Sequence, residues 1–264
     1  MDAQDFYDSL GGDYDRMVSW QARIAREGAF FRRLFGENGV QSVLDAACGT
    51  GMHAIEFARL GLRSAGADLS PAMIARAREN ARAAGVEVDL RPAAFGELAA
   101  RFTGPFDALT CLGNSLPHLA DDPALVAAFS DFASVLRPGG VCVIQNRNYD
   151  RLLRDRQRFM PPAAREDAEG ETLFLRLTDL PPAADAGSES IQFTIVTLKK
   201  RAGSWSQTVR TTPLRALRLS TIEQALEAAG FSSIQVFGSF ALAPYDAPDT
   251  GDLVVVARKQ VPLR

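Results

Sequence analysis

The stretch Val43-Leu44-Asp45-Ala46-Ala47-Cys48-Gly49-Thr50-Gly51 decides the fold of this chain. A short apolar run ends in an acidic residue, and a loop with two glycines then leads into an amphipathic segment over residues 52–60. This order predicts a strand, a tight loop and a helix, which is the first unit of a doubly wound α/β sheet. Gly49 and Gly51 allow the positive φ angles and the close ligand approach that such a loop requires.

The loop departs from the phosphate-binding loop of dinucleotide-binding proteins. That loop reads G-x-G-x-x-G and seats a pyrophosphate on a helix N-terminus. Here Ala47 stands at the first glycine position and the third glycine is absent. The sequence therefore disfavours a nicotinamide cofactor, while it keeps the features of a ligand-binding loop at the end of a strand.

A second acidic residue, Asp68, ends the next predicted strand. In the mononucleotide half of such a sheet, an acid at this place binds the ribose hydroxyls. The alternative is that Asp68 only caps the helix that follows. Ser70 already serves as the predicted N-cap of that helix, and Pro71 is its first residue, before residues 72–83. Because Asp68 has its fixed place after the Gly-rich strand–loop–helix unit, we expect it to bind a ribose.

Composition and charge narrow the class of protein. The chain has 264 residues, of which 47% are hydrophobic and 23% are charged, as in an ordinary globular domain. The formal net charge is −3 and the basic residues are scattered, so nucleic acid is not the expected partner. No apolar run is long enough to span a membrane, so no membrane association is expected.

The termini and the cysteines predict a cytoplasmic protein. Residues 1–5 are acidic and lack the basic and apolar regions of a signal peptide. The three cysteines, Cys48, Cys111 and Cys142, lack metal-ligand spacing, and their odd number indicates reduced thiols. No cluster of His, Asp and Glu has ligand spacing either, so we expect no metal.

The rest of the first half alternates as a doubly wound fold should. The expected elements are a helix over residues 15–36, strands over 86–90, 106–112 and 141–145, and a helix over 122–136 that ends at the turn 137–140. We expect the strands to be mostly parallel and buried, because they are continuously apolar.

The second half changes character. Residues 173–215 alternate like three antiparallel strands with turns at 181–187 and 201–204, which predicts a small β insertion that acts as a lid or as an oligomer contact. A helix then begins at Ser220, with Glu223 completing a capping box. Strands over 234–237 and 252–258 close the sheet, with the last strand antiparallel. The chain is thus one domain over residues 1–264.

Two further segments carry a resemblance. Cys111-Leu112-Gly113-Asn114-Ser115-Leu116-Pro117-His118-Leu119 and Gln145-Asn146-Arg147-Asn148-Tyr149-Asp150 follow two of the strands. With the loop at 45–51, they resemble the glycine N-methyltransferase and glycine/sarcosine methyltransferase family, where the segments read C-L-G-N-S-x-x-H-L and D-H-R-N-Y-D. The similarity covers roughly residues 12–155. It implies the Rossmann-like class I methyltransferase fold, S-adenosylmethionine (SAM) as cofactor, and N-methylation of a small amino acid or amine.

The resemblance also implies the residues that bind SAM. Asp45 and the loop 47–51 lie beside the methionine part, Arg23 pairs with its carboxylate, and Asp68 holds the ribose. Met73 and Phe95 pack near adenine. The full set of expected SAM-binding residues is Arg23, Asp45, Ala47, Gly49, Gly51, Asp68, Met73, Phe95 and Leu112.

For the methyl acceptor, the resemblance implies a second group of residues. Asn114 and Arg147 hold the carboxylate of an amino acid, which suits the fork of a guanidinium. Tyr14 and Tyr245 are candidates to enclose the acceptor, as is Tyr7. No catalytic base is assigned, because SAM is already an activated methyl donor. We interpret the two histidines, His53 and His118, as structural.

Departures from the family bear on the acceptor and on the reaction. Gln145-Asn146 replaces D-H, and Thr211-Thr212 stands near two tyrosines of the animal enzyme. An amino acid or amine larger than glycine is therefore at least as good a candidate. An alternative reaction is the cyclisation of SAM to azetidine-2-carboxylate with release of methylthioadenosine. Such an enzyme would have no room for an acceptor, so the pocket discriminates between the two reactions.

Overall fold

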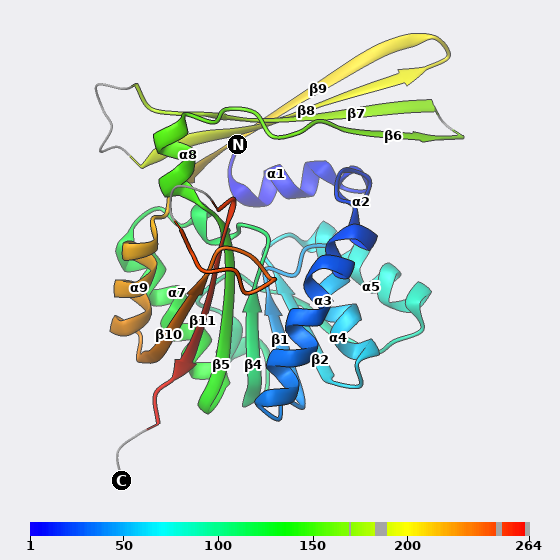
Figure 1. Ribbon diagram of the computed structural model, residues 1–264. Helices are drawn as coiled ribbons and strands as arrows, with labels where there is room; N and C mark the ends of the chain where they lie inside the picture. The colour runs from blue at the N-terminus through cyan, green and yellow to red at the C-terminus, as the bar shows by residue number, and fades with distance from the viewer. Residues whose placement is uncertain (169, 183–188, 247–249, 262–264) are drawn as a thin grey trace.

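Two β-sheets organise the chain in the computed structural model, which describes residues 1–168, 170–182, 189–246 and 250–261. The central sheet has the strand order β10-β11-β5-β4-β1-β2-β3. The second sheet has the strand order β6-β7-β8-β9. Figure 1 shows it above α1 (Ala3–Leu10) and close to α8 (Tyr149–Asp155). It lies at the end of the central sheet where β5 leads into α8.

The central sheet is parallel except for one strand. Strand β11 is antiparallel to both of its neighbours, β10 and β5. The strands are β1 (Ser42–Ala46), β2 (Arg63–Asp68), β3 (Asp89–Pro92), β4 (Phe106–Cys111), β5 (Leu136–Arg147), β10 (Phe231–Phe237) and β11 (Asp252–Lys259). The expected doubly wound sheet with an antiparallel last strand is confirmed.

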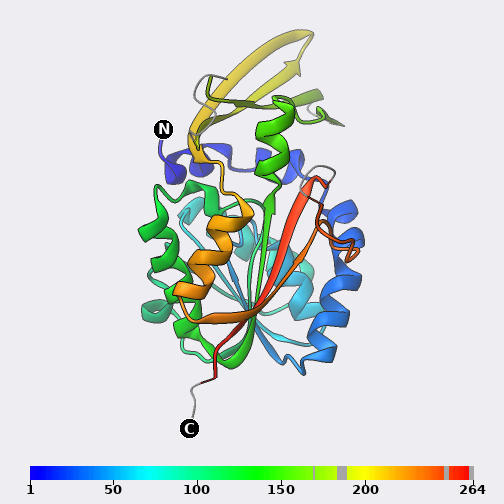
Figure 2. The same ribbon diagram turned by 60° about the vertical axis from the view of Figure 1, so that its left-hand side comes forward.

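Helices cover both faces of this sheet, as the turned view in Figure 2 shows. One face carries α3 (Trp20–Glu37), α4 (Met52–Arg59) and α5 (Pro71–Ala84); the other carries α6 (Leu98–Arg101), α7 (Asp122–Val135) and α9 (Leu219–Ala228). Because both faces are covered, the central strands are apolar in consecutive positions rather than in alternate ones.

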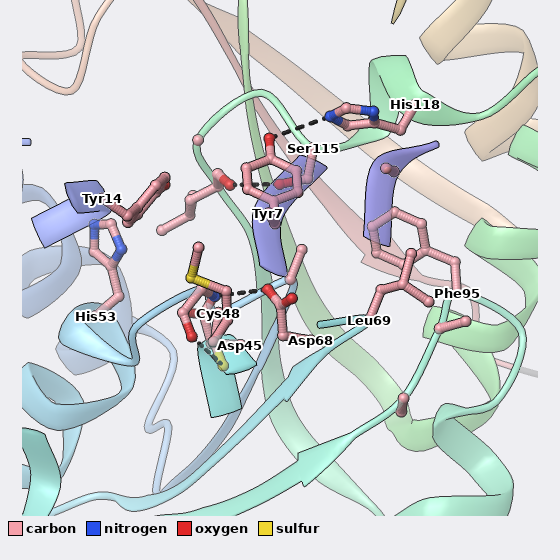
Figure 3. A pocket seen from close by; sticks show the side chains of 18 of the residues that line it. Tyr7, Tyr14, Asp45, Cys48, His53, Asp68, Leu69, Phe95, Ser115 and His118 are labelled. Atoms are coloured by element: carbon pink, nitrogen blue, oxygen red, sulfur yellow. Dashed lines mark hydrogen bonds between the residues drawn. The ribbon is translucent and has the colours of Figure 1, made fainter. Parts of the chain in front are cut away.

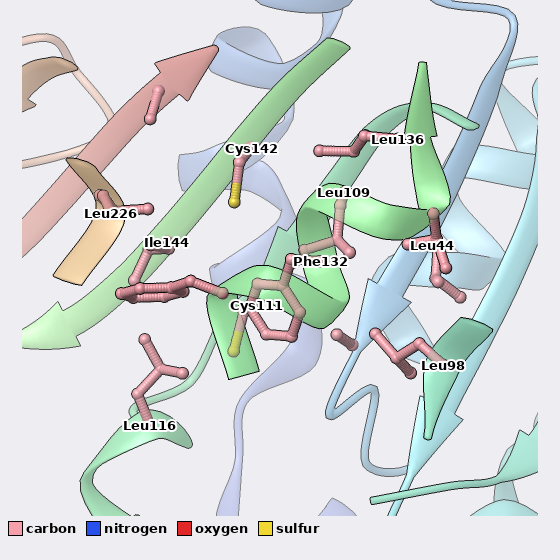
Figure 4. Close-up of a cluster of buried hydrophobic side chains, with 14 of the residues drawn as sticks. Leu44, Leu98, Leu109, Cys111, Leu116, Phe132, Leu136, Cys142, Ile144 and Leu226 are labelled. Carbon is pink, nitrogen blue, oxygen red and sulfur yellow. The ribbon is translucent and has the colours of Figure 1, made fainter. Parts of the chain in front are cut away.

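Neighbouring residues of one strand therefore belong to opposite cores. On β1, Val43 packs with the phenylalanines of α3, whereas Leu44 packs with α7 and α9. On β5, Val143 and Ile144 divide in the same way. Figure 4 shows the second of these cores, with Leu44, Ile144, Phe132 and Leu226 among its members. The two cores fix the register of every central strand, and with it the side chains at the strand ends.

The loop after β1 has the conformation that its glycines predicted. Gly49 has φ +55° and Gly51 has φ +81°, both in the left-handed region. Gly51 caps α4, and a Cβ atom on it would lie 2.8 Å from the Cβ of Ala77 on α5. Ser70 caps α5 through a hydrogen bond from the amide of Met73, with Pro71 as first residue, as expected.

Three expected boundaries are wrong. The helix expected over 15–36 is two helices, α2 (Asp13–Met17) and α3, because Val18 is extended with ψ 125°. The third strand is β3, which lies slightly later than the expected range 86–90. The expected turn at 137–140 lies inside β5, because Leu136 already pairs with Phe106 of β4.

The expected capping box of α9 is also wrong. The helix begins at Leu219 with Arg218 at the cap position, so Ser220 lies inside its first turn. The amide of Leu219 instead approaches the carboxylate of Asp150, at 3.5 Å. A tertiary contact from α8 thus takes the place of the local cap that the sequence predicted.

The inserted sheet has four strands where three were expected. They are β6 (Ala163–Asp167), β7 (Gly170–Asp179), β8 (Ser190–Arg201) and β9 (Ser204–Arg215). Strand β6 lacks an apolar alternation of its own and forms by pairing with β7. The expected turn at 181–187 falls largely on residues 183–188, which lie outside the described residues.

We predict that Gly51→Ala destabilises the fold by about 2–4 kcal/mol, because a side chain there combines left-handed backbone strain with overpacking against Ala77. Urea unfolding monitored by circular dichroism measures the change. Gly36→Ala is the matched control, because Gly36 is an exposed helical residue and a methyl group on it would meet no atom within 4 Å. It should raise stability by about 0.5 kcal/mol. Equal stability of the two variants would contradict this account of the loop.

Candidate functional site

A cavity of about 210 Å³ lies at the carboxyl ends of β1, β2 and β4, where open α/β sheets bind ligands. Figure 3 shows Asp68 between Phe95 and Leu69 on one side and Tyr14 and His53 on the other. Eight of the nine residues expected to bind SAM line this cavity: Arg23, Asp45, Ala47, Gly49, Asp68, Met73, Phe95 and Leu112. Gly51 is the exception, and its role is the close packing of α4 against α5.

Backbone amides hold the Asp68 carboxylate in place at the end of β2. One oxygen accepts a hydrogen bond from the amide of Gly49 at 2.8 Å, and the other accepts one from the amide of Ser70 at 2.9 Å. Burial raises the pKa of Asp68 to about 6, although both hydrogen bonds act to lower it. Since Ser70 is the N-cap of α5, the alternative that Asp68 only caps that helix is wrong.

Arg23 reaches the same cavity from α3 and is held by a buried acid. Its Nε donates to Oε1 of Glu27 at 3.0 Å, and its terminal nitrogens lie over Gly113 at the end of β4. Glu27 also pairs with Arg26 and with Nε2 of His53 at 2.7 Å. Because the acid occupies only Nε, the two terminal nitrogens of the guanidinium can bind an anion.

The carboxyl group of Glu27 has a strongly shifted pKa. Burial acts to raise it, but the hydrogen bond from His53 and the charge of Arg23 outweigh burial and lower the pKa to about 2. Asp45, deeper in the cavity, has no arginine in contact and accepts a hydrogen bond from Thr110 at 2.7 Å. Burial raises its pKa. The two acids therefore differ. Glu27 is ionised and pairs with cations, whereas burial makes the carboxyl group of Asp45 harder to ionise.

Aromatic side chains form the boundary of this cavity. Tyr7 and Tyr14 have ring centroids 6.2 Å apart, and the hydroxyl of Tyr7 lies 3.2 Å from Nε2 of His118. Burial raises the pKa of both tyrosines and lowers that of His118 to about 4, so all three are neutral at pH 7. Neutral aromatic rings can contact a cation without the cost of a buried charge.

A second cavity, of about 620 Å³, adjoins the first. The two share Tyr7, Tyr14, Arg23, Gly113 and His118 in their linings. The second cavity extends from the end of β5 to the inner face of the inserted sheet. It therefore lies between the two sheets, with α1 and α2 at its border.

Arg147 enters the second cavity from the end of β5. Its guanidinium donates to Oγ1 of Thr178 on β7 at 3.2 Å, and no carboxylate lies within ion-pair distance among the described residues. Burial lowers its pKa. An enclosed arginine without an acidic partner is a binding group for an anion.

Asn114 supports Arg147 and lines the same cavity. It has φ +69°, its Oδ1 accepts the amide of Arg147 at 3.0 Å, and its Nδ2 donates to the hydroxyl of Tyr149 at 2.8 Å. Gln145, which replaces an acid of the family, accepts the amide of Gly113 at 2.8 Å and donates to Asp252. These contacts join the end of β4 to the end of β5.

One expected acceptor residue lies elsewhere. Tyr245 is absent from the linings of both cavities, and its hydroxyl donates to Asn148 at 3.1 Å and approaches Asp150. Thr211 and Thr212 on β9 are likewise outside both linings. Tyr14, by contrast, lines both cavities.

Sequence reasoning missed or undervalued several residues of the site. Arg176 on β7 lines the second cavity, and nothing in its sequence context marked it. His118 was interpreted as structural, yet it lies at the junction of the cavities. Trp20 lines the first cavity and donates to Asp15 at 3.0 Å. The sequence did contain signals for the junction of the cavities, namely Tyr7, Tyr14 and His118, which line both of them.

A comparison with known protein families identifies what residues 43–140 resemble. A family model described as "Methyltransferase domain" matches residues 43–140, which contain β1 to β4, α7 and the start of β5.

Residues 43–140 are therefore similar to a methyltransferase domain.

Similar proteins extend this result. The glycine/sarcosine N-methyltransferase of Parasynechococcus marenigrum (strain WH8102) is 40% identical over 150 residues, which are 57% of this chain and 53% of that protein. The protein of the same name from Halorhodospira halochloris is 35% identical over 155 residues, 57% of this chain and 56% of its own length. The aligned parts thus span about half the length of the curated relatives. The expected resemblance to this family is confirmed.

Solved structures share the fold over almost the whole chain. The CcbJ methyltransferase from Streptomyces caelestis has a TM-score of 0.78 at 19% identity, covering 99% of this chain and 100% of that one. A SAM-dependent methyltransferase from Clostridium acetobutylicum has a TM-score of 0.77 at 18% identity, covering 97% and 99%. The class I methyltransferase fold is confirmed, and the match to these neighbours extends over the inserted region.

Two further observations concern the described part of the chain. It holds no group of three or more His, Cys, Asp and Glu side chains placed to bind a metal ion. None of its described helices combines the length and the apolar character needed to cross a membrane.

We predict that Glu27→Gln destabilises the domain by about 3 kcal/mol, because it leaves Arg23 without its buried counter-charge and weakens the hydrogen bond to His53. Since the folded pKa of about 2 lies below the unfolded value of 4.5, Glu27 stabilises the wild type above pH 4.5. That contribution is lost as the pH falls toward 2, and the variant lacks this part of the pH dependence.

Urea titrations between pH 7 and pH 3 measure both effects. Glu37→Gln on the same helix is the matched control, because Glu37 forms an exposed pair with Arg33. It should change stability by less than about 0.5 kcal/mol. A Glu27→Gln variant with the stability and pH profile of the wild type would show that the acid does not organise this end of α3.

Proposed function

We propose that this protein is a SAM-dependent N-methyltransferase of a small amino acid or related amine. One observation carries the proposal: a cavity with an anchored acid and an available arginine joins a second cavity that contains Arg147. The first matches the parts of SAM and the second has room for an acceptor. The relatives named glycine/sarcosine N-methyltransferase support the same conclusion.

The residues of the first cavity fit the chemical parts of SAM. Asp68 offers carboxylate oxygens to a ribose, and Phe95 and Leu69 offer apolar surface to an adenine. Arg23 offers its terminal nitrogens to the carboxylate of the methionine part. The loop at 47–49 has no bulky side chain, so the backbone can approach the ligand closely.

The residues of the second cavity fit an amino acid. Arg147 would pair with the acceptor carboxylate, and Asn114 would position Arg147 by accepting its backbone amide. The amine of the acceptor would then lie near Tyr7, Tyr14 and His118, which line both cavities. Tyr14, Asn114 and Arg147 are thus the proposed acceptor-binding residues.

SAM supplies an electrophilic methyl group on a positively charged sulfur. In the transfer, the lone pair of the acceptor nitrogen forms the new N–C bond, and the S–C bond breaks with its electron pair left on sulfur. The chain contributes mainly position and a low-water environment. The neutral rings of Tyr7 and Tyr14, which line both cavities, would contact the cationic sulfur when SAM is bound, and the N-methylated product would then release a proton.

The second cavity also argues against the cyclisation of SAM. That reaction places the α-amine of SAM against its own γ-carbon and needs no acceptor space. A cavity of about 620 Å³ beside the first favours a separate acceptor. No feature of the described residues favours the cyclisation.

The proposal includes the setting of the enzyme. We propose one domain over residues 1–264 in the cytoplasm, acting on a small molecule without nucleic-acid or membrane partners. Three unpaired, buried cysteines agree with a reducing compartment. A homo-oligomer is part of the proposal, because Trp205 and Val209 expose apolar surface on β9.

Mass spectrometry of SAM incubated with the protein tests this function. We expect S-adenosylhomocysteine to form only when amino acids or small amines are added, with a methylated acceptor in equal amount. Methylthioadenosine formed without any acceptor would instead establish the cyclisation. Absence of both products with a broad acceptor panel would also contradict the proposal.

We predict that SAM affinity rises with pH through about 6, because the ionised Asp68 accepts the ribose hydroxyls and its ligand-free pKa is about 6. Affinity at pH 5 should be about tenfold lower than at pH 7.5. Without ligand, the same raised pKa stabilises the fold below about pH 4, and that contribution is lost as the pH rises through 6. Isothermal titration calorimetry from pH 5 to 8 measures the binding.

Asp68→Asn is the control for this assignment. It should bind SAM more weakly at pH 7.5, by roughly 1–3 kcal/mol, and with a flat pH profile. Asp45 and Asp8 are the other acids that influence Asp68. If the slope persisted in Asp68→Asn, one of those acids would be the titrating group and the ribose assignment would fail.

A further inference from the structure

The second cavity contains a second arginine without an acidic partner. Arg176 lies on β7, and its buried Nε has no hydrogen-bond partner. The one hydrogen bond of its side chain among the described residues runs from a terminal nitrogen to the carbonyl of Pro161, at 3.3 Å. A buried guanidinium nitrogen without a partner carries a desolvation cost that a bound anion would remove.

Arg176 and Arg147 face the same space from opposite sheets. Arg147 contacts Thr178, which lies two residues from Arg176 on β7 and therefore on the same face of that strand. Burial and the positive charge of Arg147 lower the pKa of Arg176. No described carboxylate bridges the two guanidinium groups, so each repels the other.

The remaining charges of the cavity do not balance this pair. Arg23 and Arg26 share the single negative charge of Glu27, and Arg165, also in the lining, donates to the carbonyl of Ala164. Asp252 is the one acidic residue in the described lining, and one of its oxygens accepts a hydrogen bond from the Gln145 side chain. The cavity thus holds Arg147 and Arg176 without a paired acid among the described residues, which is one guanidinium group more than a single acceptor carboxylate requires.

We propose that the acceptor is an amino acid with a second acidic group, which Arg176 binds while Arg147 binds the α-carboxylate. This inference rests on the proposed function, since it assigns the acceptor class of the same site. Two carboxylates on one small molecule would neutralise both guanidinium groups and relieve their repulsion. Arg176 is then a specificity-determining residue, contributed by the inserted sheet.

The size of the cavity agrees with this acceptor class. Its volume of about 620 Å³ exceeds what glycine needs and extends from the end of β5 to β7. An amino acid with an acidic side chain can bridge that space, with its amine toward the junction at Tyr7 and Tyr14.

Matched acid and amide ligands test the proposal. L-Glutamate and L-glutamine, and L-aspartate and L-asparagine, have nearly equal shapes and differ in the second charge. Their dissociation constants are measured by calorimetry on the full chain saturated with S-adenosylhomocysteine. We expect each acid to bind about tenfold to a hundredfold more tightly than its amide, as one buried charge pair predicts.

Two variants assign the effect to its residue. Arg176→Gln should reduce the acid-to-amide ratio to about one to three, whereas Arg147→Gln should weaken the acid and the amide together. Arg158→Gln is the matched control, because Arg158 forms an exposed ion pair with Asp179 and is absent from both linings. It should keep the ratio of the wild type. Thermal melts of all three variants check that they fold.

The outcomes separate this proposal from the proposed function. Equal binding of acid and amide, no binding of any of the four, or equal weakening of both by Arg176→Gln would overturn the second-anion site. In the last case both arginines would hold one carboxylate. Turnover of monocarboxylate acceptors at the same rate as the acidic amino acids would also overturn the second-anion site. It would not contradict the proposed methyltransferase function. Discrimination in binding without any S-adenosylhomocysteine formation with SAM would overturn the methyltransferase reaction instead.

Discussion

The two backbone hydrogen bonds to the Asp68 carboxylate are the constraint on which the site depends. They tie the loop after β1, through the amide of Gly49, to the start of α5, through the amide of Ser70. The loop can reach Asp68 only because Gly49 and Gly51 have positive φ angles. A buried acid at the end of β2 thereby organises the strand end, the loop and the helix start at once.

The arginines of the two cavities differ in whether an acid pairs with them. Near the first cavity, Glu27 pairs with Arg23 and Arg26, and its contact with the Nε of Arg23 leaves the terminal nitrogens of Arg23 for an anion. Near the second cavity, Arg147 and Arg176 have no such acid among the described residues. An arginine that must be held in position is therefore paired with an acid. The arginines of the second cavity lack such an acid, and an anionic substrate would supply the missing negative charge.

Much of the central domain followed from local sequence. The Gly-rich loop, the Ser70-Pro71 helix start and the apolar strands predicted a doubly wound sheet, and eight of the nine expected cofactor residues do line one cavity. The predictions failed where a tertiary contact replaced a local signal. Strand β6 forms through its pairing with β7, and α9 begins one residue before the Ser220 that was expected to cap it.

The sequence by itself determined the strand–loop–helix unit, the acid at the end of β2 and the residue types of the family segments, because these depend on short-range geometry. Only the tertiary structure decided that Arg176 of the inserted sheet faces Arg147, and that Tyr245 lies outside both cavities. Arg147 and Arg176 belong to different sheets, and no periodicity within either strand specifies how the sheets pack. Which side chains share a cavity is set by that packing.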